Sequence, residues 1–302
     1  MNEAMSIPFY PGFVPLSLDL KDILHPRLSL TADGISEFTF SGLYLFRNRY
    51  NYRISRTKPN EGFIISGEQQ KTGKFFMTPC EIPDREILES LFSSHDYWKN
   101  ISETIFEKSR QQFDELGLTI EEDRNNFDYL YLRNELAELK GKKYHKKKNL
   151  VNQFLNSYTH EQQPLTQKLL PQALEILDQW RLDKSFPKNG DVGDYWAAKE
   201  ALECFDSLAL RGYIYFADSK PVCYCLGESI AKGKMFAIQF EKAVDHYKGI
   251  YQFMNQSFAA ALPRFFNYIN REQDLGDEGL RQAKMTYRPS GFVKKYNAHC
   301  KN

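Results

Sequence analysis

Residues 210–242 decide the fold prediction, and they read LRGYIYFADSKPVCYCLGESIAKGKMFAIQFEK. Three segments of this stretch are rich in β-branched and aromatic residues, which favour strands. A turn-like Asp-Ser-Lys separates the first two segments, and a linker with Lys232-Gly233 separates the second from the third. The stretch therefore predicts an antiparallel meander of three strands, at residues 210–217, 221–228 and 234–242.

Helical patterns precede the meander and alternate with strands after it. Apolar residues recur every three or four positions in PQALEILDQWR, residues 171–181, and in DYWAAKEALECFDSL, residues 194–208. After the meander, the pattern predicts a helix at 250–261, a strand from Phe266, a helix from Asp277 and a strand from Gly291. The predicted order is helix, helix, three strands, helix, strand, helix, strand.

The N-terminal half repeats this order more weakly. The predicted elements are helices at 18–24 and 36–46, strands at 50–56, 62–67 and 74–78, a helix at 84–92, a strand at 102–107, a helix at 109–116 and a strand at 128–132. One order found in two halves indicates a structural duplication. We therefore expect two domains of the α/β (α+β) class, residues 1–145 and 146–302.

The composition excludes several classes of protein. The chain has 302 residues, 42% of them hydrophobic, which suffices for two packed cores, and its net charge of +1 gives no global attraction to nucleic acid or membranes. No apolar run approaches the roughly 20 residues of a membrane-spanning helix, and the first residues do not resemble a secretory leader. The five scattered cysteines predict neither disulfides nor a zinc site, so we expect a cytoplasmic protein without a metal.

Three segments carry a resemblance to a known family. They are GKKYHKKKN from Gly141, QFEKA from Gln239 and YINREQDLGDEGLRQAKMTYRP at residues 268–289, and the last is the most specific. They resemble the C-terminal domain family of phosphatidylglycerol lysyltransferase over nearly the whole chain. The order of elements is similar to that of the GNAT acyltransferase fold, and two such domains in tandem resemble the Fem aminoacyl transferases.

This resemblance implies a fold and an activity. The fold is two tandem GNAT-like domains, each a mixed, mainly antiparallel sheet flanked by helices. The activity is aminoacyl transfer, with aminoacyl-tRNA as the donor and no cofactor. The sequence contains no counterpart of the multi-helix membrane region of the full-length lipid enzymes, so no integral membrane segment is expected.

Glu241 is a candidate proton acceptor on the third strand of the meander. Strict alternation puts Phe236, Ile238 and Phe240 on one face and Gln239 and Glu241 on the other. In a GNAT-like domain this strand borders the opening of the sheet, where a carboxylate can take the proton of an attacking amine or hydroxyl. The alternative is an ion pair with a neighbouring Lys or Arg.

The segment at residues 268–289 is the second candidate site. Alternation places Asn270 opposite Arg271, and a polar stripe on the following helix carries Arg281 and Lys284. The expected roles are catalysis by Asn270 and Asp274, with Asp274 as an alternative proton acceptor, and substrate binding by Arg271, Gly276, Gly279, Arg281 and Lys284. The alternative is a capped amphipathic helix without a binding role.

The lysine run at residues 140–148 is the candidate site for the donor. Several lysines that neutralise phosphates give sequence-independent and salt-dependent binding, which fits a tRNA or an anionic lipid headgroup. The alternatives are a solvated connector or the basic end of a helix. The expected donor-binding residues are Lys142, Lys143, Lys146, Lys147 and Lys148.

The loop at residues 246–251 bears on coenzyme A. GNAT enzymes carry a glycine-rich loop there, whose backbone approaches the pyrophosphate of the coenzyme. Gly249 occupies the first glycine position and is a candidate binding residue, but Tyr251 stands where a second small residue belongs. A ring at that place obstructs a phosphate, and this favours an aminoacyl-tRNA donor over acyl-CoA.

Three functions follow from the sequence. The first is a soluble aminoacyltransferase that uses aminoacyl-tRNA and acts on an amine or hydroxyl of a lipid, a peptide or a small molecule. The second is an acyl-CoA-dependent N-acyltransferase, and the third is a non-catalytic binding module on the same scaffold.

Overall fold

The computed structural model describes residues 6–57, 62–79, 81–184 and 193–301. They form two seven-stranded mixed sheets flanked by helices, as the sequence predicted. The first sheet has the order β1-β2-β3-β4-β5-β14-β6 and the second has the order β13-β7-β12-β11-β10-β9-β8. In each sheet one neighbouring pair is parallel, β4 with β5 and β11 with β12, and every other pair is antiparallel.

The strands have these bounds. In the first sheet they are β1 (Val14–Pro15), β2 (Arg53–Arg56), β3 (Phe63–Gln69), β4 (Gly73–Met77), β5 (Tyr97–Ser102), β6 (Leu118–Glu122) and β14 (Lys295–Cys300). In the second they are β7 (Asp128–Leu132), β8 (His160–Pro164), β9 (Arg211–Ala217), β10 (Lys220–Ile230), β11 (Met235–Ala243), β12 (Tyr268–Asn270) and β13 (Gly291–Val293).

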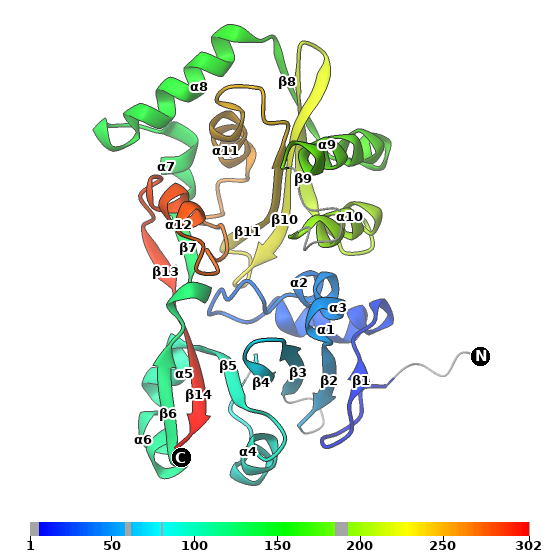
Figure 1. Ribbon diagram of the computed structural model, residues 1–302, viewed down its shortest axis with the longest axis vertical. Helices are drawn as coiled ribbons and strands as arrows, with labels where there is room; N and C mark the ends of the chain where they lie inside the picture. Colours follow the sequence, from blue (N-terminus) through cyan, green and yellow to red (C-terminus); the bar gives the residue numbers. More distant parts are fainter. Residues whose placement is uncertain (1–5, 58–61, 80, 185–192, 302) are drawn as a thin grey trace, which may run out of the picture.

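The helices lie in layers on and between the sheets (Figure 1). They are α1 (Lys21–Leu28), α2 (Phe40–Leu45), α3 (Arg47–Tyr50), α4 (Arg85–Phe92), α5 (Glu103–Lys108), α6 (Arg110–Glu115), α7 (Arg133–Glu138), α8 (His145–Ser157), α9 (Leu170–Asp183), α10 (Tyr195–Glu203), α11 (Ile250–Ala261) and α12 (Glu278–Met285). One continuous apolar core joins α1 and α2 with α9 and α10 between the sheets, and a second core packs α7, α8 and α11 on the other face of the second sheet. The two halves therefore share one interior.

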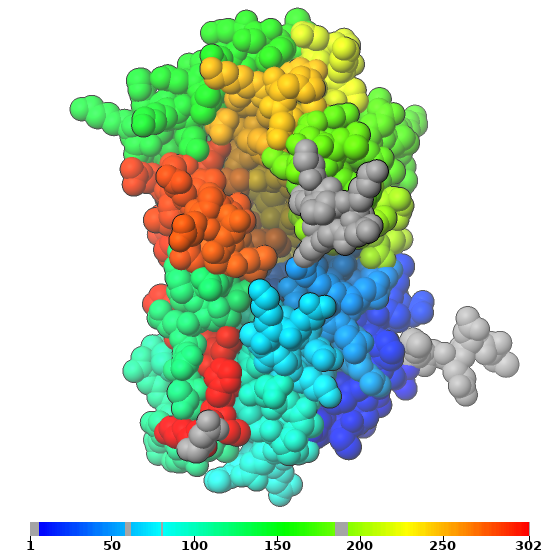
Figure 2. Space-filling view, in the orientation of Figure 1, coloured from blue at the N-terminus to red at the C-terminus, as the bar shows by residue number. Residues whose placement is uncertain are grey.

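The two sheets exchange one strand each. Strand β7 comes from the first half of the chain but lies between β12 and β13, whereas β14, the last strand, lies between β5 and β6. Figure 2 shows the red C-terminal residues in the lower lobe, among the cyan and green residues of the first half. The predicted limits 1–145 and 146–302 stay a prediction for the folding units, because neither half contains all the strands of its own sheet.

Most of the predicted elements are present, and the differences have physical causes. The meander of β9, β10 and β11 is confirmed. The strand predicted at 102–107 is wrong, because the Ser102 hydroxyl accepts a hydrogen bond from the Ile105 N–H at 3.2 Å and caps α5 instead. The single strand predicted from Gly291 is two strands, β13 and β14, which belong to different sheets. Strands β1, β5, β6 and β8 were not predicted from the sequence.

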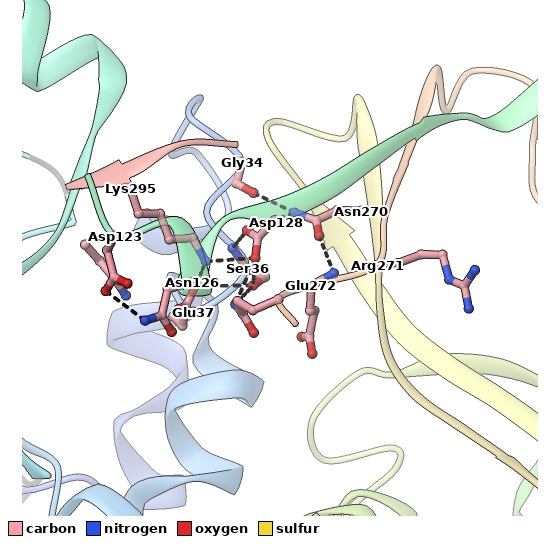
Figure 3. A network of polar contacts seen from close by, with 12 residues as sticks. Gly34, Ser36, Glu37, Asp123, Asn126, Asp128, Asn270, Arg271, Glu272 and Lys295 are labelled. Carbon is pink, nitrogen blue, oxygen red and sulfur yellow. Dashed lines mark hydrogen bonds and ion pairs between the residues drawn. The ribbon is translucent and has the colours of Figure 1, made fainter. Parts of the chain in front are cut away.

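A buried ion pair lies where the exchanged strands cross. Lys295 begins β14 and Asp128 begins β7; Lys295 Nζ lies 2.8 Å from Asp128 Oδ1 and also contacts Glu37 (Figure 3). Both side chains of the pair are fully buried. Asp128 also accepts hydrogen bonds from the Ser36 backbone N–H and hydroxyl, both at 2.9 Å. Burial alone would lower the pKa of Lys295, but the charges of Asp128 and Glu37 outweigh it and raise that pKa.

Replacing Lys295 should destabilise the protein more than replacing its neighbour Lys294. Lys295→Met leaves Asp128 buried without its cation, so the free energy of unfolding should fall by about 3–5 kcal/mol in urea titrations. The matched control is Lys294→Met, because Lys294 forms an exposed ion pair with Glu103 at 2.9 Å. That change should cost less than about 1 kcal/mol. Equal decreases in the free energy of unfolding in the two variants would show that the buried pair stabilises the fold no more than the exposed one.

Candidate active site at the opening of the second sheet

The second sheet opens between β11 and β12. The two strands pair only from Met235 with Tyr268 to Ala237 with Asn270, and beyond these residues they do not pair with each other. The residues that follow on the two strands therefore face a gap in the hydrogen-bonded ladder. Figure 2 shows the surface recessed between α12, in orange, and the helices α9 and α10, in green.

A β-bulge in β11 sets the direction of Glu241. Leu226 pairs with Phe240 and Gly227 with Ile238, so Gln239 is an extra residue. The bulge shifts the alternation by one residue and places Glu241 on the face of Phe236 and Ile238. The predicted opposite orientation is wrong for this reason. A side chain at Gly227 is excluded, because a Cβ there would lie 1.9 Å from the Ala237 carbonyl oxygen.

Glu241 and Arg271 form an ion pair across the opening. Glu241 Oε2 lies 2.5 Å from Arg271 Nη2, and the two side chains are 16% and 12% exposed. The guanidinium also lies 5.1 Å from the ring centre of Tyr287 and 5.8 Å from that of Tyr131. Burial alone would lower the pKa of Arg271, but the charge of Glu241 outweighs it, so the guanidinium stays protonated.

Three buried atoms of this pair have no hydrogen-bond partner among the residues that the structure describes. They are Glu241 Oε1, Arg271 Nε and Arg271 Nη1. A buried charged atom without a partner is costly, and ligand groups satisfy such atoms at binding sites. The free carboxylate oxygen can accept a hydrogen bond from an ammonium or hydroxyl, and the two free N–H groups can donate to a carbonyl, carboxylate or phosphate oxygen.

Lys284 holds the loop that carries Arg271. Its ammonium donates to the carbonyl oxygens of Arg271 at 2.6 Å, Glu272 at 3.1 Å and Gln273 at 2.5 Å. The side chain is buried, and burial together with the positive charge of Arg271 lowers its pKa to about 8. The structure thus brings Lys284 to the site, where all its donors serve the backbone. Its predicted role in gripping an anion stays a prediction.

Asp274 lies in the loop before α12 and is fully buried. It accepts hydrogen bonds from Arg281, Arg124, the Tyr129 hydroxyl and the Gly276 N–H, at 2.5–3.2 Å. Burial alone would raise the pKa of Asp274, but the hydrogen bonds from Arg281 and Tyr129 outweigh it and hold the pKa well below the usual range. Such a carboxylate is a weak proton acceptor, and its catalytic role stays a prediction.

The other residues predicted in this segment stabilise its backbone. Asn270 is fully buried and donates to the Gly34 carbonyl at 2.9 Å and to Asp128 at 3.1 Å, while its Oδ1 accepts from the Glu272 N–H at 2.8 Å (Figure 3). Gly276 has φ +80° and Arg281 binds Asp274, whereas Gly279 lies in the first turn of α12. Their predicted substrate contacts are not tested by the structure.

Gly249 is required for helix packing. Its φ is +84°, and a Cβ there would lie 2.2 Å from the Leu150 carbonyl oxygen of α8. Helix α8 therefore covers the N-terminal end of α11, which in a GNAT enzyme faces the pyrophosphate of coenzyme A. The predicted role of Gly249 in binding a substrate stays a prediction.

The five lysines divide into three groups. Lys142, Lys146 and Lys148 are exposed and have no ion pair in the described part of the chain. Lys143 pairs with Glu135 at 2.7 Å, and the Lys147 ammonium lies 4.1 Å from the ring centre of Tyr287. Burial and the charge of Arg271 lower the pKa of Lys147. Through Tyr287, Lys147 connects α8 with the opening, whereas the other four lysines lie outside it.

Sequence reasoning missed several residues of this region. Ser36, Glu37, Asp128 and Lys295 are distant in sequence and meet only because the sheets exchange strands. Glu272 received no role from the sequence, and its carboxylate has no partner among the described residues. Within the described ranges, no group of three or more His, Cys, Asp or Glu side chains is placed to hold a metal ion, and no helix is long and apolar enough to cross a membrane.

The fold is of the tandem GNAT type. The family model of the phosphatidylglycerol lysyltransferase C-terminal domain matches residues 29–299, so the chain belongs to this family. No curated protein matches the chain.

Three solved structures are similar over almost the full chain. A conserved protein of unknown function from Bacteroides thetaiotaomicron is 28% identical with a TM-score of 0.84, and the match covers 96% of this chain and 99% of that one. The C-terminal domain of a putative lysylphosphatidylglycerol synthetase from Agrobacterium fabrum is 14% identical with a TM-score of 0.62, over 95% and 93% of the two chains. FemX is 8% identical with a TM-score of 0.57, over 96% and 98%. The last two likenesses show the fold alone.

The pKa of Lys284 predicts a pH-dependent contribution to stability. Between about pH 8 and the unfolded pKa of about 10.4, the folded chain has released this proton and the unfolded chain retains it. The unfolded state then binds more protons, so stability rises with pH. We compare the free energies of unfolding of the wild type and Lys284→Met, measured in urea titrations. The value for the wild type, relative to that for the variant, should increase by about 1–2 kcal/mol between pH 7.5 and 9.5. A difference independent of pH would contradict the lowered pKa.

Proposed function

We propose that this chain is an aminoacyltransferase that moves an aminoacyl group from aminoacyl-tRNA to an amine or hydroxyl acceptor. The observation that carries the proposal is the set of unpartnered atoms on Glu241 and Arg271 at the opening of the second sheet. An aminoacyl ester offers matching groups, an α-ammonium for Glu241 Oε1 and a carbonyl oxygen for the free N–H groups of Arg271. Membership of the lysyltransferase family and the FemX-like fold support the same class of reaction.

The reaction is the attack of a nucleophile on an activated ester. The acceptor amine or hydroxyl forms a bond to the ester carbon, the bond to the ribose oxygen breaks, and one proton passes from the acceptor to that oxygen. The protein has to position the two substrates, stabilise the negative charge on the carbonyl oxygen and transfer the proton. Arg271 is suited to stabilise the charge, because its guanidinium is protonated and its Nε and Nη1 have no partner among the described residues. We propose no cofactor and no metal for this chemistry.

The donor and the acceptor are proposed from the surface and from the family. The exposed lysines of α8 and of the preceding turn would neutralise tRNA phosphates, and Lys147 reaches from that helix to Tyr287 beside Arg271. The acceptor would be a lipid headgroup, a peptide or a small molecule, as the name of the family and the FemX-like fold suggest. The cytoplasm, which holds aminoacyl-tRNA, is the proposed location.

A transfer assay tests the proposed function. Bulk tRNA charged with ¹⁴C-labelled amino acids is incubated with the protein and one of three acceptors: phosphatidylglycerol vesicles, a lysine-containing peptide or glycerol. We expect label in one acceptor, and Arg271→Gln should reduce the rate by about 10²-fold, a loss typical of a removed oxyanion donor. Arg264→Gln, an exposed arginine, is the control.

Two outcomes would contradict the proposal. If no acceptor takes up label and coenzyme A raises the unfolding temperature, the chain is an acyl-CoA-dependent enzyme. If no label is transferred and neither charged tRNA nor coenzyme A binds, the chain is a binding module on a GNAT-like scaffold.

The lysine run predicts a salt-dependent affinity for tRNA. Replacing Lys142, Lys146 and Lys148 together by Ala should weaken binding of charged tRNA and reduce the slope of log K against log salt by about 2–3, since each phosphate contact contributes about 0.7–0.9. Fluorescence anisotropy over a salt titration measures this slope. The control is the triple change of Lys71, Lys108 and Lys168 to Ala, which are equally exposed but lie elsewhere. Equal slopes in the two triple variants would remove the donor from this surface.

A further inference from the structure

Glu272 differs from the other acids near the opening of the second sheet. Glu241, Asp274, Asp128 and Glu37 each bind at least one cation. The carboxylate of Glu272 has no hydrogen bond or ion pair within the described residues, although the residue is only partly exposed. In Figure 3 its carboxylate points away from Arg271, and no dashed line reaches it. We propose that Glu272 is the catalytic base, the group that accepts the proton of the attacking amine or hydroxyl; this rests on the proposed function.

The backbone of Glu272 is fixed although its side chain is free. Its N–H donates to Asn270 Oδ1 at 2.8 Å, and its carbonyl accepts from the Tyr129 N–H at 3.2 Å and from Lys284 Nζ at 3.1 Å. Its φ is +54°, in the left-handed region, which is unfavourable for a residue with a Cβ. Three hydrogen bonds thus hold an unfavourable conformation that directs Arg271 and Glu272 to different sides of the opening.

The surroundings make this carboxylate a better base than its neighbours. Burial and the negative charge of Asp128 on β7 raise the pKa of Glu272 well above its usual range, and Glu37 before α2 adds to this. Lys284 on α12 and Lys295 on β14 act in the opposite direction and are the weaker influence. A raised pKa strengthens a carboxylate as a proton acceptor. The pKa of Asp274 is instead held well below its usual range, and Glu241 already shares its charge with Arg271.

The proton balance of the reaction is complete with this one group. As the nucleophile bonds to the ester carbon, its proton passes to the Glu272 carboxylate. When the bond to the ribose oxygen breaks, the protonated Glu272 returns that proton to the departing hydroxyl of tRNA. Arg271 meanwhile stabilises the carbonyl oxygen from the other side of the opening.

The test compares Glu272→Gln with Glu278→Gln in the transfer assay over pH 5.5 to 8.5. Glu278 is an exposed glutamate on α12 and serves as the matched control. The wild type and the control should gain rate as the pH rises through the pKa of Glu272. Glu272→Gln should react about 10²- to 10⁴-fold more slowly, and its rate should no longer rise with pH, so that the acid limb of the pH–rate profile is lost. Its affinity for charged tRNA should be unchanged. Its unfolding midpoint should not fall, because the change removes a negative charge next to Asp128 and Glu37.

The outcomes separate the inference from the proposed function. If the wild type transfers label and Glu272→Gln keeps both the rate within threefold and the acid limb, Glu272 is not the base and the proposed function stands. If the wild type transfers no label to any of the three acceptors, the proposed function fails and this inference fails with it. Should Glu272→Gln not fold, Glu272→Asp replaces it; the same acid limb with an undiminished rate would overturn the inference.

Discussion

The ion pair between Lys295 and Asp128 is the interaction on which the rest of the structure depends. Two chain segments cross between the sheets, and each carries a charged side chain into the shared interior. Buried charges are tolerated only when partners surround them, and Asp128 has five such donors, from Ser36, Asn270, Gln273 and Lys295. The same cluster fixes the register of both exchanged strands. It thereby holds one strand of each sheet, β7 and β14, at the same place between the sheets.

The cluster also fixes the candidate active site. Asn270 and Gln273, on either side of Arg271 and Glu272, both donate to Asp128, and Lys284 binds the carbonyls of Arg271, Glu272 and Gln273. The segment that carries the cation and the free carboxylate is therefore held at both ends and along its backbone. Catalytic groups held in this way lose little entropy when substrates bind, which is the physical advantage of a preorganised site. Polar residues predicted as ligands of the substrate mostly provide this support.

The sequence predicted those features that depend on local pattern. The meander of β9 to β11 and the helices α4, α9, α10 and α11 have clear periodicity and were found at nearly their observed positions. The strand exchange was not predictable, because strand pairing depends on contacts between residues far apart in the chain, such as Ser36 and Asp128. The bulge at Gln239 reversed the predicted face of Glu241 for a related reason, since the partner strand sets the register. The segment at residues 268–289 was recognised, but a helix-face argument cannot show that Lys284 turns inward to the backbone.

The two openings of the molecule differ in how their polar groups are satisfied, and this difference favours the second sheet as the place of the proposed chemistry. In the first sheet, β4 and β5 pair only at Phe75 with Tyr97 and Phe76 with Trp98. Lys99 follows and is buried; its ammonium donates to Gln69 at 3.1 Å and lies 4.9 Å from the ring centre of Phe75. Among the described residues of these strands and the one that follows β4, the atoms without a partner are all neutral: Thr78 Oγ1, Trp98 Nε1 and Asn100 Oδ1. The second opening instead leaves atoms of a carboxylate and a guanidinium unpartnered, and the desolvation cost is far larger for such ions than for an amide. The first opening is therefore closed by packing and belongs to the scaffold, whereas the second retains the hydrogen-bonding capacity that a charged substrate would complete.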